Sequence, residues 1–181
     1  MDNSIQKQNM TGLQQNTTEQ ALDEGKIRLL IEEAQHNALD IGTIKEIKEK
    51  QDEITIRFMR GEISNQEHDK LADVTENLPG EIKFGTLSEF MIALRALCFD
   101  EEKIQNMLAH ENDHMVAALK YHIPVKYGIL FYKTEKGLSA NTFISPEIPE
   151  TVPENEQKQM LQEIIGAPEE LSPRDKRQLG I

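Results

Sequence analysis

The chain has 181 residues, a formal net charge of −12 and an apolar fraction of 38%, below the about 45–50% of typical globular chains. We therefore expect one compact core with part of the chain outside it. Because binding to nucleic acids and anionic membranes depends on clustered positive charge, and Lys and Arg are scattered here, the composition argues against DNA, RNA or a membrane surface as partner.

The single cysteine and the N-terminal sequence bear on the cellular location. Cys98 has no second thiol to pair with, which excludes an internal disulfide and a cysteine-based zinc ribbon. The chain begins with polar residues rather than the apolar segment of a signal peptide, and no apolar run approaches the roughly 20 residues of a membrane span. These features predict a cytoplasmic protein.

The N-terminal part of the chain is predicted to be a tail followed by helices. Residues 1–18 are rich in Gln, Asn and Thr and are expected to be disordered. Residues 19–78 have apolar side chains at helical spacings, which predicts a helical appendage. Within it, Thr43 and Ser64 are predicted N-caps, each followed three residues later by a glutamate, as in a capping box. The helices over 19–76 are a candidate surface for a homo-oligomer or a protein partner.

Residues 79–145 are predicted to form a metal-bearing α+β core. The expected elements are a short strand at 81–86, helices at 87–98 and 101–120, and a β-hairpin formed by 125–133 and 138–144. Residues 146–181 follow with a linker rich in Pro and Glu, a short amphipathic helix at 154–165 and a polar tail. The predicted fold class is α+β, predominantly α-helical, with a helical N-terminal hairpin and a small β-hairpin packed on the helix at 101–120.

The most specific segment is His110-Glu111-Asn112-Asp113-His114, in the middle of the helix expected at 101–120. Residues four apart lie on the same face of a helix, so both imidazoles can reach one Zn²⁺ ion. Glu111 is rotated around the helix from His110, where it can take a proton from metal-bound water more easily than it can bind the metal. The segment therefore predicts a zinc site with a glutamate general base.

This segment resembles the His-Glu-x-x-His helix of the zincin metallopeptidases, over residues 110–114 and the flanking helix. The resemblance implies a small zinc-dependent metallohydrolase that acts on a peptide or protein substrate. It also implies His110 and His114 as metal ligands and Glu111 as the catalytic base.

A third protein ligand is needed to complete such a site. His122 is the first choice, provided that the chain turns back after Lys120, because on a continuous helix it would lie two turns beyond His114. Glutamates nearer the C-terminus are the alternatives: Glu147, Glu150, Glu154 and Glu163.

Other interpretations of the same residues stay open. A metal held by the two histidines could be structural or regulatory rather than catalytic. Glu111 and His114 also have the spacing found in di-iron helical bundles, although such bundles need this pair twice. In a different class altogether, the chain could be a non-catalytic helical adaptor or accessory protein that binds a protein partner through the amphipathic segments 19–76 and 154–165.

Overall fold

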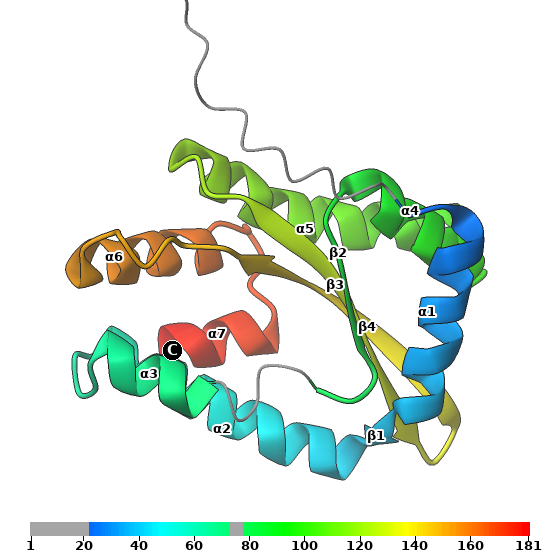
Figure 1. The fold of residues 1–181 in the computed structure, drawn as a ribbon, viewed down its shortest axis with the longest axis horizontal. Helices are drawn as coiled ribbons and strands as arrows, with labels where there is room; N and C mark the ends of the chain where they lie inside the picture. The colour runs from blue at the N-terminus through cyan, green and yellow to red at the C-terminus, as the bar shows by residue number, and fades with distance from the viewer. Residues whose placement is uncertain (1–21, 73–77) are drawn as a thin grey trace, which may run out of the picture.

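The computed structural model describes residues 22–72 and 78–181, so the tail expected at 1–18 lies outside the described residues. The fold is α+β and mostly helical, as predicted from the sequence. Figure 1 shows helices on both sides of a small mixed sheet. In chain order the elements are α1 (Glu24–Asn37), β1 (Leu39–Asp40), α2 (Ile41–Met59), α3 (Asn65–Ala72), β2 (Glu81–Phe84), α4 (Leu87–Ala96), α5 (Glu101–Lys120), β3 (Val125–Thr134), β4 (Gly137–Pro146), α6 (Glu154–Ile165) and α7 (Pro173–Leu179).

The sheet is organised around β3. Strand β4 pairs antiparallel with β3 along its whole length, from Val125 opposite Pro146 to Thr134 opposite Gly137. On the other side of β3 lie β2, which is antiparallel, and the two residues of β1, which are parallel to it. Within the described part of the chain, β4 pairs with β3 alone, so its outer edge has no strand partner. Residues 141–146 of β4 line a cavity.

Successive side chains of β3 point to opposite faces of the sheet, and each face packs against a different group of helices. Tyr127, Ile129 and Phe131 are buried in the largest core cluster, together with residues of α1, α4 and α5. Leu130 points to the opposite face, where it packs with Ile44 of α2 in a smaller cluster. The helix that carries the two histidines therefore covers one face of the sheet, and α2 covers the other.

The helices of the segment predicted as a helical appendage, 19–78, contribute side chains to the core of the molecule. Ile27 of α1 is fully buried and belongs to the same cluster as Phe90 of α4. After α1 the chain extends to pair Leu39 with β3, and α2 therefore begins at Ile41 rather than at the expected cap Thr43.

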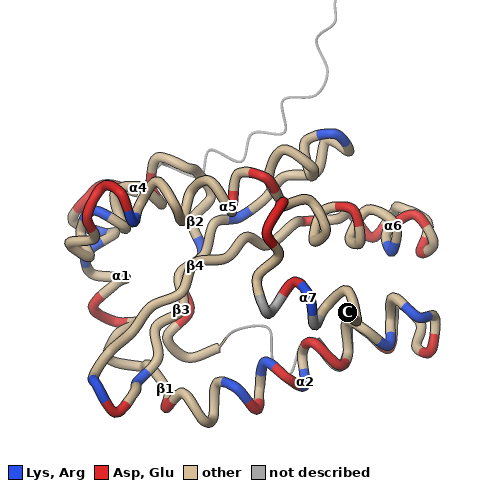
Figure 2. Tube along the Cα trace, turned by 180° about the vertical axis from the view of Figure 1, so that it is seen from behind, with Lys and Arg blue, Asp and Glu red and all other residues tan. Residues whose placement is uncertain are grey.

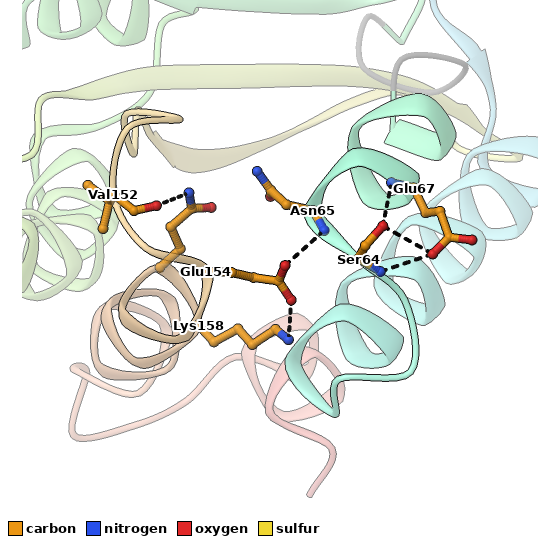
Figure 3. A network of polar contacts seen from close by, with 7 residues as sticks. Ser64, Asn65, Glu67, Val152, Glu154 and Lys158 are labelled. Atoms are coloured by element: carbon orange, nitrogen blue, oxygen red, sulfur yellow. Dashed lines mark hydrogen bonds and ion pairs between the residues drawn. The ribbon is translucent and has the colours of Figure 1, made fainter.

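The beginning of α3 is fixed to the beginning of α6 by a polar network (Figure 3). The predicted capping box is confirmed: the Ser64 hydroxyl accepts from the Glu67 backbone N–H at 3.2 Å, and the Glu67 carboxylate accepts from the Ser64 N–H at 3.0 Å. The neighbouring Asn65 N–H donates to Glu154 of α6 at 3.4 Å. Glu154 also pairs with Lys158 at 2.8 Å. This network ties the N-terminus of α3 to the N-terminus of α6.

The C-terminal region contains a helix where the sequence predicted only a polar tail. Helix α6 has the predicted bounds and ends at Gly166, but the chain then forms α7. Figure 1 shows α7 lying between α2 and α6. The location of this helix determines how the site is completed.

The charges of the described residues match the composition. Figure 2 shows Asp and Glu spread over α1, α5 and α6, with Lys and Arg dispersed among them.

Within 22–72 and 78–181, no helix combines the length and apolar character that crossing a membrane requires.

Candidate metal centre

Helix α5 brings His110 and His114 together, as predicted. Asp100 is the N-cap and its carboxylate accepts from the Lys103 N–H at 2.7 Å. The helix then continues without interruption to Lys120, so the two histidines lie one turn apart. Their ring centroids are 5.0 Å apart and the rings meet edge to face. Both imidazoles therefore point to the same side of α5.

The third member of the group is Asp175 of α7. One carboxylate oxygen lies 3.3 Å from His110 Nε2 and the other lies 3.8 Å from His114 Nε2. One ligand atom from each of the three residues lies within 4.8 Å of the others. Four ligands around Zn²⁺ at about 2.0–2.2 Å stand roughly 3.3–3.6 Å apart, so these distances fit a bound ion with small side-chain adjustments.

The hydrogen bonds of His114 indicate which ring nitrogen faces the group. Its Nδ1 lies 2.8 Å from the backbone oxygen of Ile164, and a carbonyl oxygen only accepts. Nδ1 therefore carries the proton, and in the neutral ring Nε2 presents a lone pair toward Asp175. The repulsion between this lone pair and the carboxylate is relieved either by a proton on Nε2, which makes a His114–Asp175 ion pair, or by a cation between the two groups. A metal-ligating histidine that donates its other N–H to a carbonyl has this arrangement.

Asp175 is held in place by the start of its own helix. Its carboxylate accepts from the Ser172 N–H at 2.8 Å, and its own N–H donates to the Ser172 hydroxyl at 3.2 Å. This reciprocal pair is a capping box, which fixes the first turn of a helix. Since Asp175 is 7% exposed, its carboxylate is both oriented and shielded from water.

Glu111 lies beside the metal group without belonging to it. The side chain is 4% exposed, and one carboxylate oxygen accepts a hydrogen bond from the Thr142 hydroxyl of β4 at 3.0 Å. Burial raises the pKa of Glu111, and the Thr142 hydrogen bond opposes that shift only in part. A buried carboxyl with a raised pKa next to a potential metal centre is suited to accept and return a proton.

A cavity of about 630 Å³ opens at this group. Its wall is formed by one side of α5, the outer part of β4, and residues of α2, α3, α6 and α7. His110, Glu111, His114 and Asp175 all line it. An ion held by the three ligands would therefore have a side open to the cavity, which a substrate could reach.

The structure does not bring the expected third ligands to this group. His122 follows the end of α5 in a left-handed conformation with φ of 56°, is exposed, and is absent from the group found among the described residues. The glutamate alternatives are also absent from it. Three of them have other partners: Glu147 pairs with Lys126, Glu154 pairs with Lys158, and Glu163 accepts from the Tyr121 hydroxyl, while Glu150 is exposed.

The residues that precede Asp175 form a pattern that predicts the start of a helix from the sequence alone. Ser172-Pro173-Arg174-Asp175 has the spacing of a capping box, with proline at the first helical position where it is favoured. That signal predicts a helix start but says nothing about a metal, because the carboxylate meets the histidines only through tertiary packing.

Comparisons with protein-family models, with curated proteins and with solved structures give no significant match for this chain. The class that the fold and the site define is therefore an α+β protein with a candidate His-His-Asp metal centre on a cavity wall.

Proposed function

We propose that this protein is a zinc-dependent hydrolase that cleaves amide bonds in peptides, with the ion held by His110, His114 and Asp175. The observation that carries the proposal is the convergence of these three side chains at the wall of an open cavity, with the buried carboxyl of Glu111 beside them. Three protein ligands and one open position are typical of catalytic zinc sites, whereas structural zinc sites are usually closed by four protein ligands.

The ligand types favour zinc over other divalent ions. Two imidazole nitrogens and one carboxylate suit Zn²⁺, while Mg²⁺ and Ca²⁺ prefer sites built from oxygen atoms. The proton on His114 Nδ1, inferred from its contact with the Ile164 carbonyl, leaves Nε2 free to bind the ion. The same contact would fix the orientation of the ring when the ion is absent.

Each residue then has a defined role in hydrolysis. His110, His114 and Asp175 would hold a zinc ion that, when bound, would supply a water of lowered pKa and a Lewis acid for a carbonyl oxygen. Glu111 takes the proton of the attacking water and passes it to the leaving amine. Thr142 orients the Glu111 carboxylate through its hydrogen bond, and the burial of Glu111 keeps the carboxyl away from bulk water between the two transfers.

The free edge of β4 supports a peptide as substrate. Residues 141–146 of this strand line the cavity next to the metal group. An extended peptide can pair with an unpartnered strand edge through main-chain hydrogen bonds, which bind it independently of much of its sequence. Such a strand would place a peptide bond alongside the centre.

Digestion of unstructured peptides tests this proposal. Zinc-loaded protein is incubated with a peptide mixture and the products are identified by mass spectrometry. Glu111→Gln should retain zinc and lose at least about 100-fold in cleavage rate, because the general base is gone. Glu102→Gln, an exposed change in the first turn of the same helix, should cleave like the wild type. Peptides left intact by zinc-loaded protein, or cleavage that persists in Glu111→Gln, would contradict the proposal.

A further inference from the structure

One face of α5 carries large apolar side chains that stay exposed to solvent. Because a helix has about 3.6 residues per turn, Asn112, Val116 and Leu119 lie along one side of α5. Val116 is 46% exposed and Leu119 is 56% exposed. His110 and His114 project from the other side of the helix, where they line the metal cavity. The exposed apolar face is therefore separate from the candidate metal centre.

The N-terminal half of this face is hollowed. A cavity of about 270 Å³ lies there, between the start of α4, the middle of α5 and one side chain of β3. Its lining residues are Leu87, Gln105, Leu108, Ala109, Asn112 and Tyr127. Leu87 is itself 42% exposed. Single exposed apolar side chains are normal on a protein surface, but several of them beside a hollow indicate an interaction site.

A second copy of the chain fits both halves of the face. In a two-fold dimer with the two α5 helices antiparallel, the exposed side chains at one end of each helix meet the hollow at the other end of its copy, and the contact occurs twice. If Asn112 lies near the axis, Val116 faces Leu108 of the second copy. Leu119 then faces Gln105 of the second copy. An asparagine in the middle of a helix pair can also fix its register.

The charges at the two ends of α5 favour the antiparallel arrangement. Glu102 in the first turn and Lys120 in the last turn are exposed, and their spacing of about five helical turns puts them on the same edge of the helix. Antiparallel pairing about a two-fold axis brings Glu102 of each copy beside Lys120 of the other, whereas parallel pairing would bring the two acidic ends together. We infer that the protein forms a two-fold dimer through this face, with the two α5 helices antiparallel.

Sedimentation equilibrium of the full chain over a range of concentrations tests the inference. The wild type should approach twice the mass of one chain as the concentration rises. Leu119→Glu puts a charge into the apolar contact and should weaken the dimer by at least about tenfold. Leu29→Glu is the matched control, because Leu29 is 66% exposed on α1, outside the proposed contact, and the dimer should persist. A wild type that stays monomeric up to about 0.5 mM, or a dimer unaffected by Leu119→Glu, would overturn the inference.

Exchange of the two end charges tests the orientation of the helices. Glu102→Lys and Lys120→Glu each set like charges side by side and should each weaken the dimer by about fivefold. The double variant Glu102→Lys/Lys120→Glu restores opposite charges in both pairs and should recover most of the wild-type affinity. A double variant that dimerises no better than the single variants would overturn the antiparallel pairing. Both positions are exposed, so the variants should fold, which thermal unfolding checks.

Discussion

The two ring nitrogens of His114 have opposite functions in this account. Nδ1 donates to the Ile164 carbonyl, and Nε2 faces Asp175 and the candidate ion. Since the carbonyl fixes the tautomer, the ring is prepared for metal binding by a backbone contact from α6 rather than by the metal itself.

A direct check is the tautomer of His114 in the zinc-loaded protein, measured by ¹⁵N NMR of the imidazole ring. We predict a protonated Nδ1 and an unprotonated Nε2 at His114. The exposed His36 supplies a reference ring without a metal ligand role. A His114 ring protonated at Nε2 in that state would contradict its assignment as a ligand.

Burial of Glu111 gives the metal-free protein a defined pH dependence. Its pKa is raised above the ordinary value of 4.5, so the folded state holds the proton more tightly than the unfolded chain. The contribution of Glu111 to the free energy of unfolding is then fully present below pH 4.5 and is lost as the pH rises toward the raised value. The glutamine of Glu111→Gln has no carboxyl proton, so this pH-dependent contribution to the free energy of unfolding is absent from the variant.

Urea unfolding of metal-free wild type and Glu111→Gln across that pH range measures the effect. The stability of the wild type relative to the variant should fall as the pH rises above 4.5. A difference that stays constant, or that increases with pH, would show that the carboxyl is not desolvated in the folded state.

At the scale of elements, the capping box of α7 orients a candidate metal ligand. Ser172 fixes the first turn of α7 and, through it, the Asp175 carboxylate. Ser64 and Glu67 form the equivalent box at the start of α3. The two caps are chemically alike, but only one of them orients a candidate ligand.

Ser172→Ala and Ser64→Ala should therefore have similar effects on stability and different effects on zinc. Each removes a cap, which costs about 1 kcal/mol of stability. Ser172→Ala should also weaken zinc binding by about tenfold or more, because the support of a ligand is lost. Chemical denaturation and zinc titration against a competing chelator measure the two effects. Equal zinc affinity in both variants would mean that Asp175 does not bind the ion.

The pairing of β3 with β4 depends on Gly128, because the Phe143 ring occupies the space that a side chain would need. Gly128→Ala should destabilise the protein by about 1–3 kcal/mol, since the ring must move. In Gly128→Ala/Phe143→Ala that clash is relieved, so the combined cost should be smaller than the sum of the two single changes. Chemical denaturation of the wild type, the two single variants and the double variant tests the pairing of Gly128 with Phe143. Purely additive losses of stability would contradict that pairing.

Helix α5, the β3–β4 hairpin and α6 were predictable because each has its own local pattern. The apolar periodicity of α5 and its Asp100 cap put His110 and His114 on one face. The alternating residues of β3 indicated a strand. These patterns involve neighbours along the chain, so the sequence expresses them directly.

Long-range contacts account for what the sequence did not show. Asp175 reaches the histidines only because α7 packs between α2 and α6 (Figure 1), and its polar sequence gave no sign of that packing. His122 was the natural expectation because it is near in sequence, but α5 ends just before it and leaves it exposed. Likewise α1 has an apolar face that could cover many surfaces, and only the fold shows that it packs on α4.

At the scale of the whole molecule, a free sheet edge, the buried Glu111 carboxyl and the candidate metal ligands meet in one cavity of an acidic α+β protein. These parts come from distant regions of the chain: α5, β4 and α7. Metal binding would join α5 to α7 and should therefore stabilise the fold as a whole.

The metal content of the purified protein tests the central claim most directly. Elemental analysis of the wild type is compared with His110→Ala, Asp175→Ala and His122→Ala after zinc loading and removal of free metal. The account predicts about one zinc ion per chain in the wild type and in His122→Ala, and almost none in the other two variants. A folded wild type that takes up no zinc, or an Asp175→Ala protein that retains it while His122→Ala loses it, would contradict the site described above.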